Sequence, residues 1–510
     1  MNVSDRLVEI LEESGISDVF GIPGEQIMSL YKSLSTSKIN HVLTRHEQAA
    51  AHAADGYARA TGKIGVCITT ASPGALNTTM ALATAYKDNV PILLLTGDNE
   101  LEFKGTDYFQ STPQVEILSH IVRQSYNPRN GTEAVFMLKA AIHELRNFPK
   151  GPIHINLSKD VLLQDDFEDI DLCYLCDEDM SNIGKAQDLI DKCKKPLLIL
   201  GAGAISESEN ISRIVDEFHI PVTTTFHAMG VIPDENPLNL GLSGLRATDQ
   251  GKYAFENSDC IIGLGIKGSE RTLIEIPDNF IHVNINRDVL IGDCQIHGKV
   301  GDFISQIRFK KADWIGEILK HSGNYDFEGL DDDLKPQAAI KRILDKFSDN
   351  IIVSDAGSHT TWTSFLKKSQ KPGQLLFSGG MAPMGYGLPA AIGASIASGE
   401  RVIVINGDGD FQMNLQELAT IRERSLDVIV FIINNSELGI IRQWQEDFYD
   451  MESYQVKLNN PDFVKLASSY GIDAIRVDNL DDLELILQKD LAGPVVVDVV
   501  VESENIPLPK

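Results

Sequence analysis

The sequence predicts an α/β protein of three domains, each built on a mainly parallel β-sheet flanked by helices. Short apolar runs rich in Val, Ile and Leu alternate with helical patterns along almost the whole chain, as expected of strand–helix–strand units. Two polar segments interrupt this alternation. The chain has 510 residues, which is too long for one hydrophobic core and fits roughly three domains of about 150 residues each.

Each predicted strand is an apolar run bounded by Gly, Pro, Asp or Asn. In chain order, these runs cover residues 64–70, 91–97, 152–158, 196–203, 221–226, 260–266, 279–285, 350–357, 401–407, 427–435 and 494–501. Continuous rather than alternating apolar character is typical of strands that are buried on both faces. The runs therefore favour parallel sheets with helices on both sides.

The two interrupting segments predict the domain boundaries. Residues 162–185 are acidic without clear periodicity, and residues 321–336 are polar and rich in turn-forming residues. We interpret both as connectors between domains. The predicted domains are residues 1–165, 185–315 and 335–510.

Composition excludes several function classes. A hydrophobic fraction of 43% with 23% charged residues is typical of a globular protein. The formal charge of −28 disfavours nucleic-acid binding, because phosphates would be repelled. No apolar run approaches the roughly 20 residues needed to span a membrane, and the N-terminal 21 residues predict a capped amphipathic helix with acidic residues, unlike a signal peptide. We expect a soluble, cytoplasmic protein with no membrane partner.

The six cysteines are scattered along the chain. Cys173 and Cys176 form a C-x-x-C, but they lie in the acidic connector, and no second pair or histidine cluster follows. The pattern fits reduced cytosolic thiols better than a metal or redox site.

A Gly-Asp-Gly-Asp turn follows one predicted strand, and a pair of asparagines ends the next. Asp408 lies in the turn, and Asn435 ends the strand at residues 427–435. The helical pattern at residues 411–424 lies between them, so the two side chains are expected at the same edge of a parallel sheet. Ligands bind at this edge, where Gly-rich turns let backbone N–H groups approach phosphate.

An aspartate beside a phosphate needs a cation between the two anions. Mg²⁺ fits, because it prefers oxygen ligands and is commonly held by one or two protein groups together with substrate phosphate. We predict a Mg²⁺–diphosphate site whose ligands are Asp408, Asn435 and the backbone carbonyl of Glu437. An ordinary turn aspartate is the alternative reading of Gly-Asp-Gly alone.

This pairing of motifs resembles the signature of the thiamin-diphosphate (ThDP) enzymes. The family also requires a glutamate that faces the aminopyrimidine ring of the cofactor, and residues 44–66 look like that element, with Glu47 in the matching position. There the carboxyl group promotes the proton transfer that activates the cofactor. Taken alone, Glu47 also fits an ordinary charge at a helix start.

The resemblance implies further cofactor contacts and names the domains as pyrimidine-binding, central and diphosphate-binding. It places Pro73 and Gly74 against the pyrimidine with Asn77 nearby, and Met384 as the support of the bent cofactor; a core methionine is the alternative. The residues that it assigns to the diphosphate side are Ser358, His359, Gly407, Asp408, Gly409, Asp410, Asn435, Leu438 and Gly439.

Among ThDP enzymes the chain is most similar to the acetolactate synthase catalytic subunits, over nearly its whole length. Members decarboxylate pyruvate and join the remaining two-carbon unit to a second 2-oxo acid, which gives 2-acetolactate or 2-aceto-2-hydroxybutyrate for branched-chain amino acid biosynthesis. Residues 105–127 look like the loop that carries Phe109 and Gln110 into the active site, with Gln110 in a catalytic role.

Two residues would separate a carboligase from a simple decarboxylase. Arg271 aligns with an arginine that binds the carboxylate of the second 2-oxo acid, a task suited to bidentate pairing. Trp444 aligns with a tryptophan that narrows the acceptor pocket. A surface arginine and an aromatic residue in a helix core are the respective alternatives. A ThDP lyase or carboligase with another substrate is the alternative function, and a non-catalytic homologue would have no use for Glu47.

Some features depart from the family or stay open. Residues 241–246, 268–271 and 282–286 replace motifs that bind FAD in biosynthetic synthases, which puts FAD in doubt. In the family Glu47 and the Gly-Asp-Gly turn of one site come from different chains, so the resemblance implies a homodimer at least, with a tetramer expected. A small regulatory subunit and the identity of the acceptor stay open.

Overall fold

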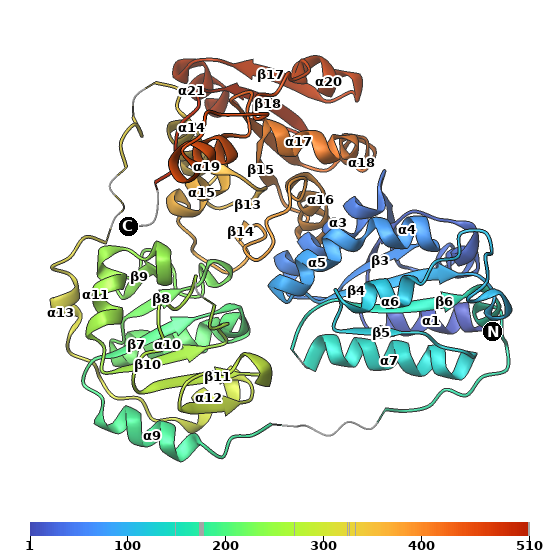
Figure 1. Ribbon diagram of the computed structural model, residues 1–510, viewed down its shortest axis with the longest axis horizontal. Helices are drawn as coiled ribbons and strands as arrows, with labels where there is room; N and C mark the ends of the chain where they lie inside the picture. Colours follow the sequence, from blue (N-terminus) through green and yellow to red (C-terminus); the bar gives the residue numbers. More distant parts are fainter. Residues whose placement is uncertain are drawn as a thin grey trace. The chain divides into compact units, whose positions relative to one another are not determined.

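The chain folds around three six-stranded sheets (Figure 1). The computed structural model describes residues 1–147, 149–172, 178–269, 271–323, 325, 327–331 and 333–507. Every strand pair with a defined register runs parallel, which confirms the predicted fold class. Cys173 and Cys176 lie outside the described residues.

The chain divides into two compact units by its internal contacts. The first contains residues 1–174, 331–363 and 376–505, and the second contains residues 175–330, 364–375 and 506–510. The first unit therefore holds the N-terminal and C-terminal sheets together. Each sheet lies within one of the three predicted domains, whose boundaries stay a prediction.

The N-terminal sheet has the strand order β2-β1-β3-β4-β6-β5. Its strands are β1 (Asp18–Gly21), β2 (Asn40–Leu43), β3 (Gly65–Thr69), β4 (Ile92–Asp98), β5 (Gln124–Tyr126) and β6 (Ile153–Ser158). Its helices are α1 (Val3–Glu13), α2 (Met28–Leu34), α3 (Glu47–Thr61), α4 (Ser72–Asn77), α5 (Thr79–Asp88), α6 (Gln114–Ser119), α7 (Gly131–Asn147) and α8 (Lys159–Leu162). Asn2 caps α1 by accepting from the Asp5 N–H at 3.0 Å, so a capped helix does begin the chain. The helix ends at Glu13, however, and residues 18–21, which the sequence predicts as part of it, form β1.

The C-terminal sheet has the order β14-β13-β15-β16-β18-β17. Its strands are β13 (Ile351–Ser354), β14 (Leu375–Leu376), β15 (Val402–Gly407), β16 (Val428–Asn434), β17 (Asp473–Val477) and β18 (Val495–Val500). Its helices are α14 (Pro336–Lys346), α15 (Ser358–Leu366), α16 (Gly387–Ser398), α17 (Asp408–Asn414), α18 (Leu418–Glu423), α19 (Gly439–Tyr449), α20 (Phe463–Ser469) and α21 (Leu480–Gln488).

The central sheet has the order β12-β11-β10-β7-β8-β9. Its strands are β7 (Pro196–Leu200), β8 (Val222–Thr224), β9 (Asn239–Leu242), β10 (Cys260–Leu264), β11 (Phe280–Asn284) and β12 (Cys294–His297). Its helices are α9 (Ile183–Lys192), α10 (Ser208–Phe218), α11 (Asp249–Asn257), α12 (Val300–Gln306) and α13 (Ile315–Ile318). These elements enclose an apolar core of their own.

Helices α3 and α16 join the N-terminal and C-terminal sheets into one unit, and Figure 1 shows them side by side. Two glycines bring the helices into backbone contact, because a Cβ at Gly56 would overlap the carbonyl oxygen of Ala390 and one at Gly393 would overlap that of Ala53. Residues 49–58 of α3 are all buried. A helix buried on every side belongs to a core, and here that core is shared by both sheets.

A buried ion network reinforces this contact. The Arg59 guanidinium on α3 lies 2.5 Å from Asp55 and 2.7 Å from Asp88. The Tyr386 hydroxyl, just before α16, donates to Asp55 at 2.8 Å, and the Gly380 N–H donates to Asp88 at 2.8 Å. The loop that precedes α16 is thereby fixed to the N-terminal domain.

Arg59→Ala is expected to destabilise the first unit by about 3–5 kcal/mol, because it leaves two buried carboxylates without their cation. Chemical denaturation of the variant and the parent protein measures this difference. Arg401→Ala is the matched control, since Arg401 pairs at 3.0 Å with the partly exposed Asp427, and its loss should change stability by less than about 1 kcal/mol. Equal losses of stability in the two variants would contradict a large contribution of the buried network to the free energy of unfolding.

In the part of the chain that the structure describes, no helix is long and apolar enough to cross a membrane.

Candidate functional site

The Gly-Asp-Gly turn forms the junction between β15 and α17. The strand ends at Gly407 and the helix begins at Asp408, whose side chain is only 2% exposed. Asn460 Nδ2 donates to Asp408 Oδ2 at 2.6 Å. Burial raises the pKa of the Asp408 carboxyl above its usual range, although hydrogen bonds from Asn460 and from backbone N–H groups oppose this shift. Asp408 is thus a poorly solvated acid at a strand end.

The asparagine pair lies at the end of the neighbouring strand. Gly407 of β15 is in register with Ile433 of β16, so both strands end at the same edge. Asn460 Nδ2 also donates to Asn434 Oδ1 at 3.1 Å and so bridges Asn434 and Asp408. The Asn435 side-chain oxygen accepts from the Glu437 N–H at 3.2 Å. The structure therefore brings the two sequence motifs together.

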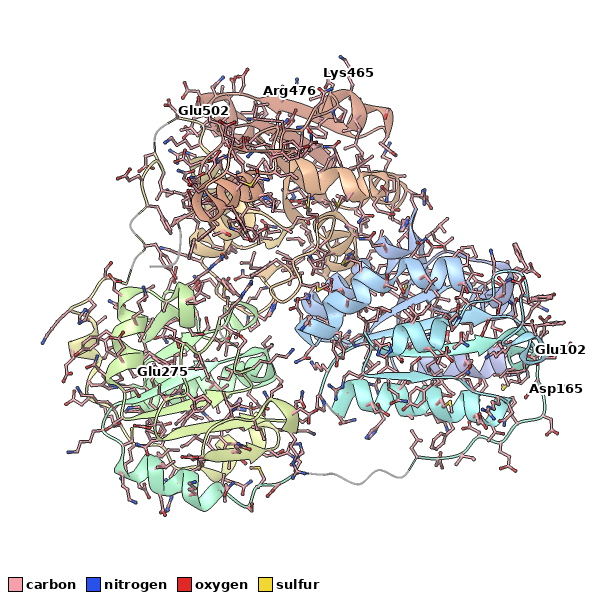
Figure 2. The ribbon with its side chains drawn as sticks, viewed as in Figure 1. Glu102, Asp165, Glu275, Lys465, Arg476 and Glu502 are labelled. Carbon is pink, nitrogen blue, oxygen red and sulfur yellow. The ribbon has the colours of Figure 1, made fainter. Side chains whose placement is uncertain are left out.

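Side chains on the neighbouring strands hold the Asn434 side chain in place. Its side-chain amide donates to Asp498 Oδ1 at 2.8 Å, and Asp498 is fully buried on β18. Arg476 on β17, labelled in Figure 2, pairs with the other carboxylate oxygen of Asp498 at 2.8 Å. The strand end that carries Asn434 and Asn435 is consequently held through two further strands.

Glu437 is buried and paired. Its carboxylate accepts from Arg442 Nε at 2.8 Å, from Lys457 Nζ at 2.9 Å and from the Ser503 hydroxyl. Burial would raise its pKa, but these hydrogen bonds outweigh burial and leave the pKa below the usual range. The Glu437 side chain thus serves the fold of the loop.

His359 and Asp410 lie beside the turn. His359 Nε2 is 3.2 Å from Asp410 Oδ2 without hydrogen-bond alignment, and burial lowers the pKa of the imidazole to about 3, so the ring is neutral. Burial, followed by the charge of Asp355, raises the pKa of Asp410 well above its usual range. Among the described residues, His359 Nε2 and the Ser358 hydroxyl are buried polar atoms without a hydrogen-bond partner.

Asp355 was not identified from the sequence. It follows β13, and its carboxylate accepts from the N–H groups of Gly385, Tyr386 and Gly387 at 2.9, 3.2 and 2.6 Å, at the start of α16. Asn406 Nδ2 donates a further bond at 3.0 Å. Burial raises the pKa of Asp355 to about 6 despite these donors. The groups that hydrogen-bond to Asp355 and Asp408 are neutral amides and N–H groups. The negative charge of an ionised Asp355 or Asp408 is therefore not balanced by these partners, which favours a bound cation.

Apolar side chains line the other side of the turn. A Cβ at Gly409 would lie 3.1 Å from Leu438 and 3.2 Å from the methyl group of Met384, so the glycine leaves room beside both side chains. Met384 is half-buried rather than a core residue. Gly439 begins α19, and a Cβ there would lie 3.0 Å from the Asn435 amide. The residues that the sequence assigns to the diphosphate side thus form one group.

A separate group surrounds Glu47, the first residue of α3. Asn77 Nδ2 donates to Glu47 Oε2 at 2.9 Å, and a Cβ at Gly74 would lie 3.3 Å from Glu47 Oε1. Pro73 and Gly74 are in the first turn of α4. Burial, and then the negative charge of Glu47, raises the pKa of the Cys67 thiol. The pyrimidine-side residues are therefore assembled on the N-terminal sheet.

The predicted active-site loop reaches this second group. Asn99 donates to the Phe109 carbonyl at 2.9 Å, and the Ser72 hydroxyl, next to Pro73, donates to the Gln110 carbonyl at 2.7 Å. Gln110 has a positive φ of 55°, and the Phe109 side chain is 70% exposed. Phe109 is thus presented at the surface, and Gln110 is half-buried, on a loop anchored beside Pro73.

The two residues predicted to select the acceptor lie in different units. Trp444 on α19 is 44% exposed, so the alternative of a helix-core aromatic is wrong. Arg271 lies in the second unit and is exposed. Burial of Arg246, and then the positive charge of Arg271, lowers the pKa of the Arg246 guanidinium.

Comparisons with known proteins agree with this arrangement. Residues 1–117 match "Thiamine pyrophosphate enzyme, N-terminal TPP binding domain", residues 183–307 match the central domain, and residues 355–499 match the C-terminal TPP binding domain. The chain is 34% identical to "Probable acetolactate synthase large subunit" of Methanocaldococcus jannaschii, with 100% of this chain and 93% of the relative covered. The chain belongs to the acetolactate synthase family of thiamine pyrophosphate enzymes.

Other members of the acetolactate synthase family are similarly related. "Acetolactate synthase 1, chloroplastic" of Nicotiana tabacum is 35% identical, with 99% of this chain and 82% of the relative covered. "Acetolactate synthase large subunit" of Cyanidium caldarium is 34% identical, with 98% and 93% covered. The pyrimidine-side group and the Asp408 group fall within the two matched TPP binding domains. The chain is accordingly a ThDP-dependent enzyme of the acetolactate synthase type.

Proposed function

We propose that the chain is a ThDP- and Mg²⁺-dependent acetolactate synthase. It would decarboxylate pyruvate and join the remaining two-carbon unit to a second 2-oxo acid, giving 2-acetolactate or 2-aceto-2-hydroxybutyrate in branched-chain amino acid biosynthesis. The observation that carries the proposal is the Glu47–Asn77 pair at 2.9 Å, because it supplies the acid–base group that a diphosphate site alone lacks. Full-length similarity to the acetolactate synthase family supports the choice of reaction.

The residues present fit thiamin diphosphate and Mg²⁺. When bound, ThDP supplies an acidic carbon whose conjugate base adds to a 2-oxo acid and accepts the electrons left by CO₂. Asp408, Asn435 and the Glu437 carbonyl would hold Mg²⁺, since oxygen donors suit this ion and poorly compensated acid lies at this edge. The unpartnered Ser358 and His359 atoms would donate or accept at the diphosphate.

Glu47 would hold and move a proton at the pyrimidine. Its Oε2 is engaged by Asn77, which leaves Oε1, next to Gly74, to face a ring nitrogen. Positioned proton transfer of this kind contributes about 10²–10⁴-fold to a rate. Pro73 and Gly74 would contact the ring, while Met384, Leu438, Gly409 and Gly439 would bound the cofactor on the diphosphate side.

Four residues outside the two cofactor groups would select the acceptor 2-oxo acid. Arg271 would pair with the carboxylate of the second 2-oxo acid, Trp444 and Phe109 would narrow the pocket, and the Gln110 amide would orient a substrate oxygen. We propose that Glu47 of one chain serves the Asp408 group of a second, which makes a homodimer the minimum and a tetramer the expected assembly. A small regulatory subunit and a cytoplasmic location are further parts of the proposal.

A product assay tests the function. Purified protein with pyruvate, ThDP and Mg²⁺ is expected to form 2-acetolactate, and omission of Mg²⁺ or addition of EDTA should stop it. Addition of 2-oxobutyrate as a competitor identifies the preferred acceptor. Acetaldehyde as the product, or turnover of a different 2-oxo acid alone, would overturn the proposal in favour of another ThDP decarboxylase, lyase or carboligase. The visible absorption spectrum of the same sample decides whether FAD is present.

A further inference from the structure

Glu417 is a fully buried acid outside the site described above. It ends the 3₁₀ helix η7 (Leu415–Glu417), nine residues after Asp408, and its side chain is 0% exposed. A buried carboxylate needs hydrogen-bond partners to offset the loss of hydration. The partners of Glu417 lie on the N-terminal domain as well as on its own, within the first unit.

The carboxylate of Glu417 connects the diphosphate-binding domain to the backbone just before Glu47. Its Oε1 accepts from the Arg45 N–H at 2.8 Å, and its Oε2 accepts from the Thr420 hydroxyl at 2.7 Å. Burial raises the pKa of the Glu417 carboxyl, and the Thr420 hydroxyl and the backbone of Arg45 and His46 oppose this shift. The acid thus holds the backbone N–H of Arg45, two residues before Glu47.

The segment that precedes Glu47 is also held from its own domain, since the Thr44 N–H donates to the Gly21 carbonyl of β1 at 3.4 Å and the Thr44 hydroxyl donates to the His46 carbonyl at 3.0 Å. Strand β2, which leads into it, lies at the edge of the N-terminal sheet and is hydrogen-bonded there to β1. His46 caps α3 by accepting from the Gln48 N–H at 3.1 Å, but this bond lies within the segment itself. Beyond these local bonds, the position of the loop depends on the residues that pack against the outer side of β2.

Other groups from residues 415–424 also follow this edge. Arg424 Nη1 donates to Asn40 Oδ1 at 3.1 Å, and the Thr420 hydroxyl lies 3.4 Å from the Leu43 carbonyl. Glu423 pairs with Arg45 at 2.6 Å, but its side chain is 48% exposed. Within this group, Glu417 is the fully buried acid that holds the backbone nearest to Glu47.

We propose that Glu417 is a positioning residue that sets the location of the Glu47 carboxyl group. The inference rests on the proposed function, because it assumes that Glu47 moves the proton at the pyrimidine. A displacement of about 1 Å at a reacting group lowers rates by up to about 10²-fold. Loss of the Glu417–Arg45 bond frees the first turn of α3 and thereby moves Glu47 without touching the cofactor.

The direct readout is hydrogen–deuterium exchange at the acidic carbon of enzyme-bound ThDP, quenched in acid and followed by ¹H NMR. Glu417→Ala is expected to slow this exchange by about 10- to 100-fold. The dissociation constant for ThDP with Mg²⁺ should stay within about threefold, because Glu417 lies outside both cofactor groups. Glu417→Gln should restore the exchange rate to within about threefold, since its amide oxygen can accept from the Arg45 N–H.

A second variant and a double mutant keep the test decisive. If Glu417→Ala does not fold, Glu417→Asp replaces it, because the shorter side chain keeps the charge but cannot reach Arg45. In the double variant Glu47→Gln/Glu417→Ala, hydrogen–deuterium exchange should be no slower than in Glu47→Gln alone, because a positioning residue acts only through its partner. Glu423→Gln is the matched control at the same edge and should change exchange by less than about twofold.

Two outcomes separate this inference from the proposed function. If Glu47→Gln itself leaves the exchange rate unchanged, the proposed role of Glu47 is wrong and the inference fails with it. If Glu47→Gln slows exchange but the folded Glu417 variants do not, the inference alone is wrong. Exchange that declines only in proportion to ThDP affinity would assign Glu417 a purely structural role and would likewise overturn it.

Discussion

The enzyme with Glu47 replaced by glutamine is expected to bind ThDP and Mg²⁺ normally but to turn over pyruvate at least about 100-fold more slowly. Glutamine has nearly the same shape and can still accept from Asn77 Nδ2, which donates to Oε2 at 2.9 Å. It cannot take up and release a proton at the pyrimidine. Steady-state kcat, together with calorimetric titration of ThDP, separates the loss of chemistry from any loss of binding.

A control substitution makes this result specific. Glu25→Gln removes an acid that also lies on the N-terminal domain but is 70% exposed and pairs with Lys159 at 3.1 Å. Its kcat should stay within about twofold of the parent value, because surface pairs contribute little. A Glu47→Gln enzyme with normal kcat would show that the glutamate is an ordinary helix-start charge after all.

Asp408→Asn is expected to weaken Mg²⁺-dependent ThDP binding by at least about 10- to 100-fold, since it neutralises the metal ligand. The same change should not lower the thermal stability of the cofactor-free protein. The pKa of Asp408 is raised by burial, so its ionised form destabilises the fold at every pH above the usual carboxyl range, and a neutral amide removes this penalty. Binding and stability therefore change in opposite directions.

Thermal unfolding with and without ThDP and Mg²⁺ measures both effects in one experiment. The parent protein should show a large rise in Tm on cofactor addition and the variant a small one. Asp427→Asn, on the surface beside Arg401, is the control and should keep the full cofactor shift. A variant that loses stability without cofactor, yet gains the full shift with it, would remove Asp408 from the metal site.

Burial helps a strand to be predicted from the sequence, although the buried strand β1 was missed because its four residues were predicted as the end of a helix. All the predicted runs form strands, and these are strands such as β3, β4 and β16 that are buried along their whole length. The edge strands β2, β5 and β17 went unpredicted because most of their residues are exposed or half-buried and their sequences are mixed in polarity. An edge strand is defined by its neighbour, and a local pattern carries no information on that neighbour.

Some residues of the candidate site could be predicted from the sequence and others could not. Asp408 and Asn435 could be predicted because each belongs to a short motif at a strand end, and the register of β15 with β16 brings these ends together. Asn460 could not, since it reaches Asp408 from a loop with no motif of its own. Asp355 left a weak signal, as an acid directly after a buried strand, which is the same signal that identified Asp408.

The contact between α3 and α16 has a consequence for how the chain is made. Helix α3 ends at Thr61, and α16, which covers one side of it, begins only at Gly387. At ribosomal rates of about 5–20 residues per second, the wait between them is about 15–65 s. During this time the nascent N-terminal domain presents an alanine-rich, uncovered helix face, and the burial of this face has to wait until α16 has been synthesised. A chaperone that shields this face would have that interval in which to act.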